Sequence, residues 1–426
     1  MAHHTVRSGY QDLTDRLNRF PQGAPPSESL YRILGLLFSE REARLVSLLP
    51  IRPFTASRAA RTWRMSPAQA QEILEGLASR ALLLDLEIRG RQLYLLPPPM
   101  AGFFEFSMMR LRGDVDQQAL AELFHQYLNV EEDFVKALFA EGETQLGRIL
   151  VHEGTLSGPS ALHVMDYERA SEVIRTARPM GVGLCYCRHK MAHLGRACDN
   201  PQAICMTFNT AAASLIKHGY ARQVDPLEGL DLLQEARGLH LVQFGENVQR
   251  GVSFICNCCG CCCEAMIAAR RFGLMHPVHT TNFLPATNAG NCNGCGKCVT
   301  ACPVEAMSLV SAHDPQAPKR QRASLDPRVC LGCGVCAGVC ARDGIRMESR
   351  PVRVITPLDS VRRTVLMAVE RGKLQNLIFD HHALRSHRAM AAVLGVILKL
   401  PPVRRTLASR QLRSRYLDTL IGRSRA

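Results

Sequence analysis

Eight cysteines in the C-terminal half of the chain stand in two runs that share one spacing, C-x2-C-x2-C-x3-C. The first run is Cys292, Cys295, Cys298 and Cys302, and the second run is Cys330, Cys333, Cys336 and Cys340. Thiolates at this spacing hold [4Fe-4S] clusters, because a tight turn presents three of them to one face of a cubane. Glycines between the cysteines, such as Gly294 and Gly332, give the backbone the freedom that such a turn requires. A pair of zinc ribbons is the alternative, but zinc sites favour C-x2-C pairs separated by a longer loop.

Both runs, with Pro303 directly after the first, make residues 284–350 resemble the bacterial-type dicluster ferredoxins. The resemblance implies two [4Fe-4S] clusters and one-electron transfer, and in such ferredoxins the fourth cysteine of each run binds the other cluster. It therefore implies one cluster on Cys292, Cys295, Cys298 and Cys340, and a second cluster on Cys330, Cys333, Cys336 and Cys302. Two features depart from the family pattern: Ala341 replaces the second proline, and residues 313–323 look like a surface insertion between the runs.

Ten further cysteines lie between residues 181 and 283, a region that we expect to bind metal. They are Cys185, Cys187, Cys198, Cys205, Cys256, Cys258, Cys259, Cys261, Cys262 and Cys263. The apolar runs 182–186 and 252–255 predict two strands that pair in parallel and present these thiols at one edge of a small α/β unit. Six of the cysteines fall within eight positions and cannot all bind one ion, because adjacent residues of a strand point to opposite faces.

Three interpretations of this cysteine-rich region stay open: a third iron–sulfur centre, a structural zinc site, and a redox-active thiol or disulfide pair. The CCGCCC run superficially resembles the cysteine-rich modules of heterodisulfide-reductase-like proteins, but its spacing differs from theirs and no residue role carries over. His189 and His193 stand four residues apart and either join a metal or form an ordinary solvated pair. Arg188, beside Cys187, would stabilise the negative charge of a thiolate or a cluster. As a whole, the chain resembles a larger family of ferredoxin-like iron–sulfur proteins.

Residues 27–100 have the pattern of helices followed by a hairpin, which resembles a winged helix. The stretch from Ser66 to Gln69 is a capping box with a proline in the first turn, so a helix begins there. The resemblance implies that this helix is the recognition helix and that the hairpin around Gly90 is the wing. Glu72 and Glu75 on the recognition helix would repel phosphates, so we expect a protein-docking module and little sequence-specific DNA binding.

Together these patterns predict a multidomain α+β protein with six regions. We expect a flexible tail over residues 1–26, a winged-helix-like domain over 27–100, a helical connector over 101–180, a cysteine-rich α/β metal-binding region over 181–283, a dicluster ferredoxin domain over 284–350, and a basic helical region over 351–426. The last region contains an amphipathic stretch, residues 389–400, that suits a membrane surface or packing on the ferredoxin domain.

The composition restricts the class of protein. Eighteen clustered cysteines in a chain of 426 residues without a signal peptide exclude a secreted disulfide scaffold and favour a reducing cytoplasm. The net charge of +14 falls to about +10 when two clusters at −2 each are counted. This surplus suits an acidic protein, a membrane surface or nucleic acid. The longest apolar run, residues 390–398, is too short to span a membrane.

We therefore predict an iron–sulfur electron-transfer protein that relays electrons between a redox partner and a further metal or thiol centre in residues 181–283. A redox enzyme with its active centre at that cysteine site is one alternative, and a redox-sensing winged-helix regulator is the other. The sequence has no glycine-rich nucleotide fingerprint, so it does not imply flavin or nicotinamide binding.

Overall fold

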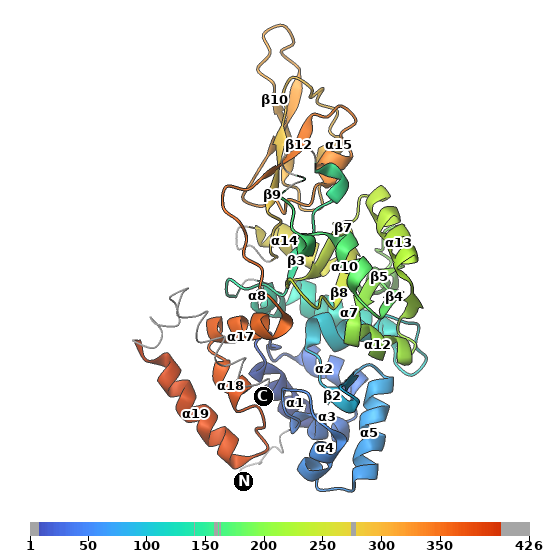
Figure 1. The fold of residues 1–426 in the computed structure, drawn as a ribbon, viewed down its shortest axis with the longest axis vertical. Coiled ribbons are helices and arrows are strands. Elements are labelled where there is room, and N and C mark those ends of the chain that lie inside the picture. Colours follow the sequence, from blue (N-terminus) through green and yellow to red (C-terminus); the bar gives the residue numbers. More distant parts are fainter. Residues whose placement is uncertain (1–7, 140, 157–160, 162, 274–277, 402–426) are drawn as a thin grey trace. The chain divides into compact units, whose positions relative to one another are not determined.

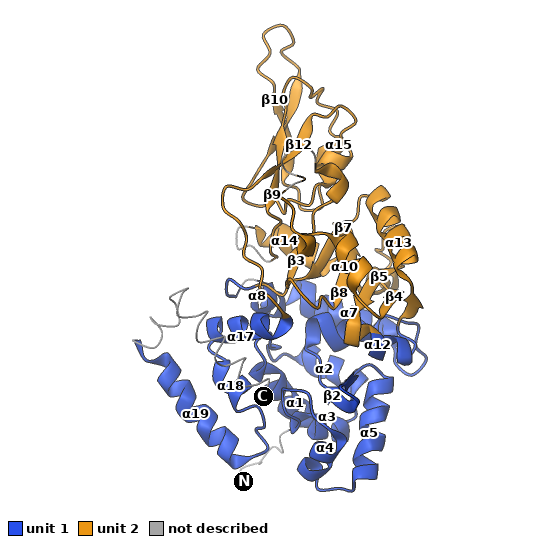
Figure 2. Ribbon diagram, in the orientation of Figure 1, with its two compact units in different colours: residues 1–144, 213–220, 360–426 blue, residues 145–212, 221–359 orange. Residues whose placement is uncertain are grey.

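The computed structural model describes residues 8–139, 141–156, 161, 163–273 and 278–401. It divides into two compact units, shown in Figure 2. Unit 1 comprises residues 1–144, 213–220 and 360–426, and unit 2 comprises residues 145–212 and 221–359. Both helices and small sheets are present, which agrees with the predicted α+β class, and all eighteen cysteines lie in unit 2. Within the described ranges, no helix has the length and apolar character needed to cross a membrane.

Unit 1 begins with a series of helices followed by a hairpin (Figure 1). The elements are α1 (Gly9–Arg19), α2 (Glu28–Leu37), α3 (Glu40–Ser47), α4 (Ala56–Trp63), α5 (Pro67–Ser79) and the antiparallel strands β1 (Leu84–Ile88) and β2 (Arg91–Leu95). The predicted capping box is confirmed: the Ser66 side chain accepts from the Gln69 amide, and the Gln69 side chain accepts from the Ser66 amide. Helix α3 was not expected, although Ser39 and Glu42 form a capping box of their own.

The prediction of a flexible tail over residues 1–26 is wrong for residues 9–19, which form α1. Leu13 and Leu17 are buried on one face of this helix. Arg16 is also buried, and its guanidinium donates to the carbonyl oxygens of Leu49 at 2.8 Å and Pro50 at 2.6 Å. The polar composition of the segment conceals this helix, because a narrow apolar stripe and one buried arginine are enough to anchor it.

The remaining helices of unit 1 come from the middle and the end of the chain. They are the π-helical turns Pro99–Phe103 and Gln126–Val130, α6 (Phe104–Ser107), α7 (Gln117–His125), α8 (Asp133–Phe139), α17 (Ser360–Glu370), α18 (Leu374–Ile378) and α19 (Arg385–Lys399). An aromatic core joins the middle helices, with the Phe104 ring 5.0 Å from both Phe103 and Phe124. The expected helical connector over 101–180 is wrong beyond residue 144, because the chain there enters unit 2 and forms a strand.

The basic C-terminal region is helical as predicted, but its expected packing on the ferredoxin domain is wrong. Residues 360–401 cluster with the N-terminal helices in unit 1. Lys373 donates to the carbonyl oxygen of Phe20 at 3.2 Å, and the buried Asp380 pairs with Arg52 at 3.1 Å. A buried carboxylate needs a cationic partner, and the N-terminal helices supply it. The arginine-rich end, residues 402–426, lies outside the described residues.

Unit 2 contains a six-stranded sheet with the order β3-β7-β8-β5-β4-β6. Its strands are β3 (Gly147–Ile149), β4 (Met180–Leu184), β5 (Ala203–Phe208), β6 (Arg222–Val224), β7 (Val242–Glu246) and β8 (Phe254–Cys258). Every neighbouring pair is antiparallel, so the predicted parallel pairing of β4 with β8 is wrong: β5 lies between them. Since β4 and β8 are both antiparallel to β5, they run in the same direction and end at the same edge of the sheet.

Within the described residues, α10 (Ala170–Thr176), α11 (Tyr186–His193), α13 (Pro226–Gly238) and α14 (Glu264–Arg271) belong to unit 2, and α12 (Asn209–Lys217) begins in unit 2 and ends in unit 1. Ile174, Val182, Phe208, Leu233 and Ile255 form part of one buried apolar cluster. This cluster fixes the strands that carry Cys205 and Cys256, because packed cores resist displacement.

The C-terminal part of unit 2, which we call the ferredoxin-like part, consists of two similar halves. Its elements are β9 (Phe283–Thr287), α15 (Lys297–Thr300), β10 (Met307–Ser311), β11 (Gln321–Leu325), α16 (Val335–Gly338) and β12 (Ile345–Ser349). Strand β9 pairs with β12, and β10 pairs with β11, so the two halves share both small sheets. The expected insertion over 313–323 is shorter than predicted, because residues 321–323 already belong to β11.

Candidate metal centres

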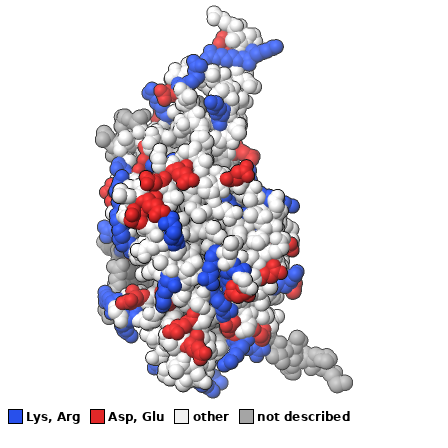
Figure 3. Space-filling model, turned by 90° about the vertical axis from the view of Figure 1, so that its right-hand side faces the viewer, with Lys and Arg blue, Asp and Glu red and all other residues white. Residues whose placement is uncertain are grey.

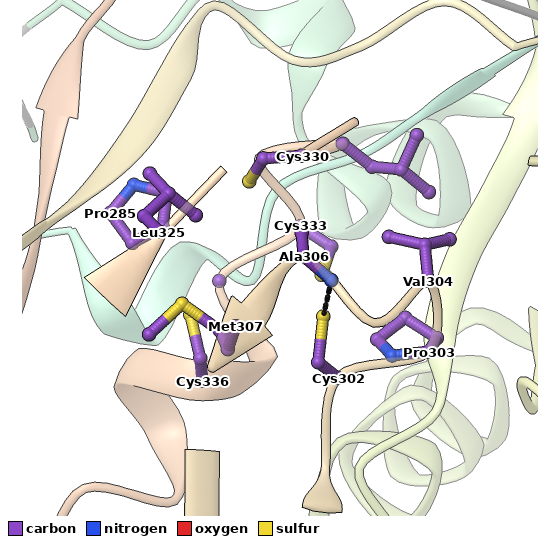
Figure 4. A pocket seen from close by; sticks show the side chains of 12 residues that line it. Pro285, Cys302, Pro303, Val304, Ala306, Met307, Leu325, Cys330, Cys333 and Cys336 are labelled. Atoms are coloured by element: carbon purple, nitrogen blue, oxygen red, sulfur yellow. Dashed lines mark hydrogen bonds between the residues drawn. The ribbon is translucent and has the colours of Figure 1, made fainter. Parts of the chain in front are cut away.

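One apolar pocket in the ferredoxin-like part is lined by cysteines from both runs (Figure 4). Val304, Met307, Leu325 and Leu331 contribute to its wall. Its thiols are Cys302, Cys330, Cys333 and Cys336. Cys302 follows α15 of the first half, whereas the other three precede or begin α16 of the second half. The fourth cysteine of the first run therefore lies with the second run.

The fourth cysteine of the second run, Cys340, lies in turn near Cys298 of the first run. Burial raises the pKa of the Cys298 thiol, and the neighbouring thiols of Cys292, Cys295 and Cys340 raise it further. Cys340 is the fourth cysteine of the second run, yet it lies with the first three of the other run. The eight thiols thus form two sets of four, each drawn from both halves of the ferredoxin-like part.

Tight turns place these thiols, and glycine makes the turns possible. Gly294 and Gly332 have positive φ angles of 72° and 71°, which residues with a Cβ rarely adopt. A Cβ on Gly332 would also lie 2.2 Å from the carbonyl oxygen of Phe283. The predicted need for glycine at both positions is therefore confirmed.

The backbone around the two sets favours negative charge on sulfur. Amide N–H groups donate to three thiol sulfurs: Ala306 to Cys302 at 3.2 Å (Figure 4), Ala323 to Cys292 at 3.3 Å, and Gly332 to Cys330 at 3.4 Å. Burial has the opposite effect and is the main reason why the pKa of Cys330 is raised to about 11 and that of Cys333 to about 12. Thiols with such pKa values lose their protons when a metal ion binds to the sulfur atoms in place of the protons.

Four of the ten upstream cysteines form a compact group that we call the four-thiol site. Its members are Cys198, Cys259, Cys261 and Cys262, whose sulfur atoms all lie within 4.8 Å of one another. The sulfur of Cys198 is 3.7 Å from that of Cys259 and 3.8 Å from that of Cys262, and Cys261 is 3.7 Å from Cys262. Three of these cysteines come from the loop between β8 and α14, and Cys198 comes from the segment after α11.

The other six thiols form a closed chain of neighbours that we call the six-thiol ring. Its order is Cys185, Cys187, Cys263, Cys258, Cys256, Cys205 and back to Cys185. The sulfurs of Cys258 and Cys263 are 3.2 Å apart. Cys185 and Cys263 are the N-caps of α11 and α14, and a helix N-terminus stabilises thiolate charge. The ring therefore lies at the sheet edge where β4 and β8 end, with two helix N-termini beside it.

Hydrogen bonds around the ring shift the pKa values of its members in opposite directions. A hydrogen bond from Cys205 lowers the pKa of Cys256 to about 5, and one from Cys187 lowers that of Cys263 to about 6. The donors have raised pKa values, as Cys205 does through its bonds to Cys185 and Cys256. In the four-thiol site, a hydrogen bond from Cys262 lowers the pKa of Cys259 to about 4.

Arg188 lies beside both groups of thiols. The residue is 1% exposed, and its guanidinium donates to the carbonyl oxygens of Pro201 at 2.9 Å and Asn257 at 2.8 Å. Burial lowers the pKa of Arg188, but Cys185 of the ring and Cys259 of the four-thiol site outweigh burial and raise it. The expected stabilisation of thiolate charge by Arg188 agrees with this position.

The two histidines considered as further ligands lie together on α11. The rings of His189 and His193 are 4.9 Å apart, and neither belongs to the four-thiol site.

Two residues that the sequence did not single out join the cysteine-rich region to the ferredoxin-like part. A Cβ on Gly260 would lie 2.8 Å from the carbonyl oxygen of Pro303, so the loop of the four-thiol site touches the residue after Cys302. His152 donates its amide N–H to the carbonyl oxygen of Cys333 at 2.9 Å, and its Nε2 lies 3.0 Å from the carbonyl oxygen of Leu241. A glycine between cysteines in CCGCCC could have indicated the close approach at Gly260, but nothing in the sequence pointed to His152.

Comparisons with known proteins bear on the ferredoxin-like part. Residues 291–343 match the family model of the 4Fe-4S dicluster domain. Over 61 residues, the chain is 38% identical to NADH-quinone oxidoreductase subunit I of Pelobacter propionicus. The aligned stretch covers 13% of this chain and 33% of the relative. The chain thus spans only a third of that relative's length. No solved structure matches the chain. The matched region and its grouped thiols support an iron–sulfur role in electron transfer for residues 291–343.

Proposed function

We propose that this chain is an electron-transfer protein with two [4Fe-4S] clusters, which relays electrons between a redox partner and a further centre in residues 181–283. The observation that carries the proposal is the grouping of the eight ferredoxin-like thiols into two sets of four. One set would be Cys292, Cys295, Cys298 and Cys340, and the other would be Cys330, Cys333, Cys336 and Cys302.

Each cluster, when bound, accepts or donates one electron at a time. The chain's own residues would hold the cluster and adjust its potential. The amides of Ala306, Ala323 and Gly332 donate to cluster-binding sulfurs, and such bonds stabilise negative charge at a metal site. The apolar wall of the pocket excludes water, which limits the stabilisation of charge by solvent.

Contacts between the two regions of unit 2 support a relay between them. The loop that carries Cys259 and Cys261 touches Pro303, the neighbour of Cys302, through Gly260. Arg270 of α14 and Glu305 form an ion pair at 3.1 Å, which ties the same two segments together. Electrons could therefore pass between the second set and the cysteine-rich region without a change in the fold.

The proposal assigns the fourth cysteine of each run to the cluster of the other run, and this assignment can be tested directly. We expect Cys340→Ala to damage the cluster held by Cys292, Cys295 and Cys298, and Cys302→Ala to damage the other cluster. The full chain would be purified without oxygen, and each cluster would be followed by EPR and Mössbauer spectroscopy during a redox titration. Loss of the cluster held by Cys330, Cys333 and Cys336 in Cys340→Ala would contradict the assignment.

We further propose that residues 27–100 form a winged-helix-like docking module. The bridge between Phe54 and Tyr94 adds a third segment to the hairpin, an arrangement found in winged helices. Helix α5 exposes Glu72 and Glu75, which suits a protein partner better than a phosphate backbone. The reducing setting that keeps eighteen thiols available for metal would be the cytoplasm.

A further inference from the structure

We infer that the ten upstream cysteines form two separate centres, and that Cys198, Cys259, Cys261 and Cys262 bind a single metal ion in a tetrahedron of thiolates. This inference deepens the proposed function, in which the further centre of residues 181–283 has no assigned structure. The ion would be zinc or iron, the metals that four thiolates in a tetrahedron select.

The distances between sulfur atoms favour one ion over a cubane. A metal–sulfur bond of about 2.3 Å in a regular tetrahedron places the sulfurs about 3.8 Å apart. Three of the six observed separations are 3.7 Å for Cys198 and Cys259, 3.8 Å for Cys198 and Cys262, and 3.7 Å for Cys261 and Cys262, and the other three are no longer than 4.8 Å. A cubane binds each thiolate through a different iron, so its four sulfurs would have to stand farther apart.

The local backbone explains why neighbouring cysteines separate into two groups. Cys256 and Cys258 alternate with Asn257 on β8, so both point to the face of the sheet that carries the ring. Cys263 is the N-cap residue of α14, and its sulfur lies 3.2 Å from that of Cys258. The intervening loop leaves the strand and carries Cys259, Cys261 and Cys262 toward Cys198, with Gly260 pressed against Pro303.

Arg188 supplies positive charge beside the four-thiol site as well as beside Cys185 of the ring, and this charge favours thiolates there. Its buried guanidinium donates to two carbonyl oxygens, and within the described residues its Nε has no hydrogen-bond partner. A buried cation needs a compensating anion. Four thiolates around one divalent ion carry a net charge of −2, and Cys259 lies close enough to influence Arg188.

Two adjacent cysteines give a matched pair of variants, because Cys258 belongs to the ring and Cys259 to the four-thiol site. The full chain would be purified without oxygen, and iron, zinc and acid-labile sulfide would be counted per chain. We expect Cys259→Ser to lose about one metal ion with no loss of sulfide, and Cys258→Ser to retain that ion. If the ion is zinc, X-ray absorption spectroscopy should show four sulfur ligands at about 2.3 Å. If the ion is iron, Mössbauer spectroscopy should show an iron site without sulfide.

Loss of several irons together with an equal number of sulfides in Cys259→Ser would overturn the inference, as would loss of the same single ion in Cys258→Ser. If Cys259→Ser fails to fold, Cys261→Ser removes an exposed thiol of the same site and should give the same loss. Cys295→Ser tests the proposed clusters without touching the four-thiol site. This variant should lower the amount of sulfide per chain and leave the single ion in place. A wild-type chain without sulfide would refute the clusters but not the single ion.

Discussion

Single residues decide how the cysteines of this protein are divided. Cys302 and Cys340 each lie with the opposite run, and Cys258 and Cys259 are adjacent yet belong to different groups. The first arrangement is the one that the family resemblance implies from the spacing of the ferredoxin-like cysteines, and it stays a prediction until the ligands of each cluster are identified. The separation of Cys258 from Cys259 depends on the residue at which β8 ends. The run of cysteines does not predict that residue.

Gly260 is the residue through which the four-thiol site touches the ferredoxin-like part. A Cβ at this position would lie 2.8 Å from the carbonyl oxygen and 3.0 Å from the Cα of Pro303, and both are backbone atoms. We expect Gly260→Ala to reduce the free energy of unfolding by roughly 1–3 kcal/mol, because extra volume displaces the backbone. It should also shift the potential of the cluster on Cys302 more than that of the other cluster.

The measurements are chemical unfolding without oxygen and a redox titration followed by EPR. Gly238→Ala is the matched control, because a Cβ there meets no atom within 4 Å. An equal shift of both cluster potentials in Gly260→Ala would show that the contact is not specific to the second set.

Among the elements, β5 determines how the cysteine-rich region is built. It separates β4 from β8 and brings Cys205 between the cysteines that follow or end those strands. Apolar runs that end in cysteine predicted the two outer strands and their common edge. The intervening antiparallel strand could not be predicted, because strand order depends on contacts between distant parts of the chain.

An ion pair between the buried Asp380 and the half-exposed Arg52 joins the segment after α18 to the segment between α3 and α4. Asp380 is 0% exposed and accepts from the backbone and the guanidinium of Arg52, and Arg58 lies 3.8 Å away. Burial raises the pKa of Asp380, but hydrogen bonds from Arg52 outweigh burial and lower it. The stability from this pair is therefore present above the ordinary pKa of aspartate, and it is lost as the pH falls through the lowered value.

We expect Asp380→Asn to weaken the attachment of residues 373–388 by roughly 1–3 kcal/mol, the range for hydrogen bonds to charged groups. Hydrogen exchange should show faster exchange in α18 and in the segment that follows it. Asp326→Asn serves as the control, because that carboxylate is more exposed and pairs only locally, with Arg328 at 2.8 Å. Unchanged exchange in Asp380→Asn would mean that apolar packing alone holds these helices.

At the scale of the whole molecule, the net charge of +14 is the difference between 52 Lys and Arg and 38 Asp and Glu. Figure 3 shows acidic and basic side chains interspersed over the face that it draws. The sequence suggested six consecutive regions, but it did not predict that unit 1 gathers residues 1–144, 213–220 and 360–426. Such a return of the chain depends on long-range pairs such as Asp380 with Arg52, which have no local sequence signal.

This distribution of charge leads us to expect weak DNA binding that does not depend on base sequence. The net charge of +14 attracts phosphates in general, but Glu72 and Glu75 stay exposed on α5, where a recognition helix would meet DNA. Fluorescence anisotropy with two unrelated duplexes should give similar affinities that fall steeply with salt. A tight complex with one duplex at physiological salt would contradict this expectation.

On the proposed assignment, the exchange of Cys302 and Cys340 between the two sets would also govern when clusters can be inserted during protein synthesis. Cys292, Cys295 and Cys298 leave the ribosome well before Cys340, and the chain folds as it emerges. The first set would therefore lack a ligand until β11 and α16 have been made. Neither set would be complete in a nascent chain that stops between the two runs, so we expect iron and sulfide to be delivered to the finished ferredoxin-like part.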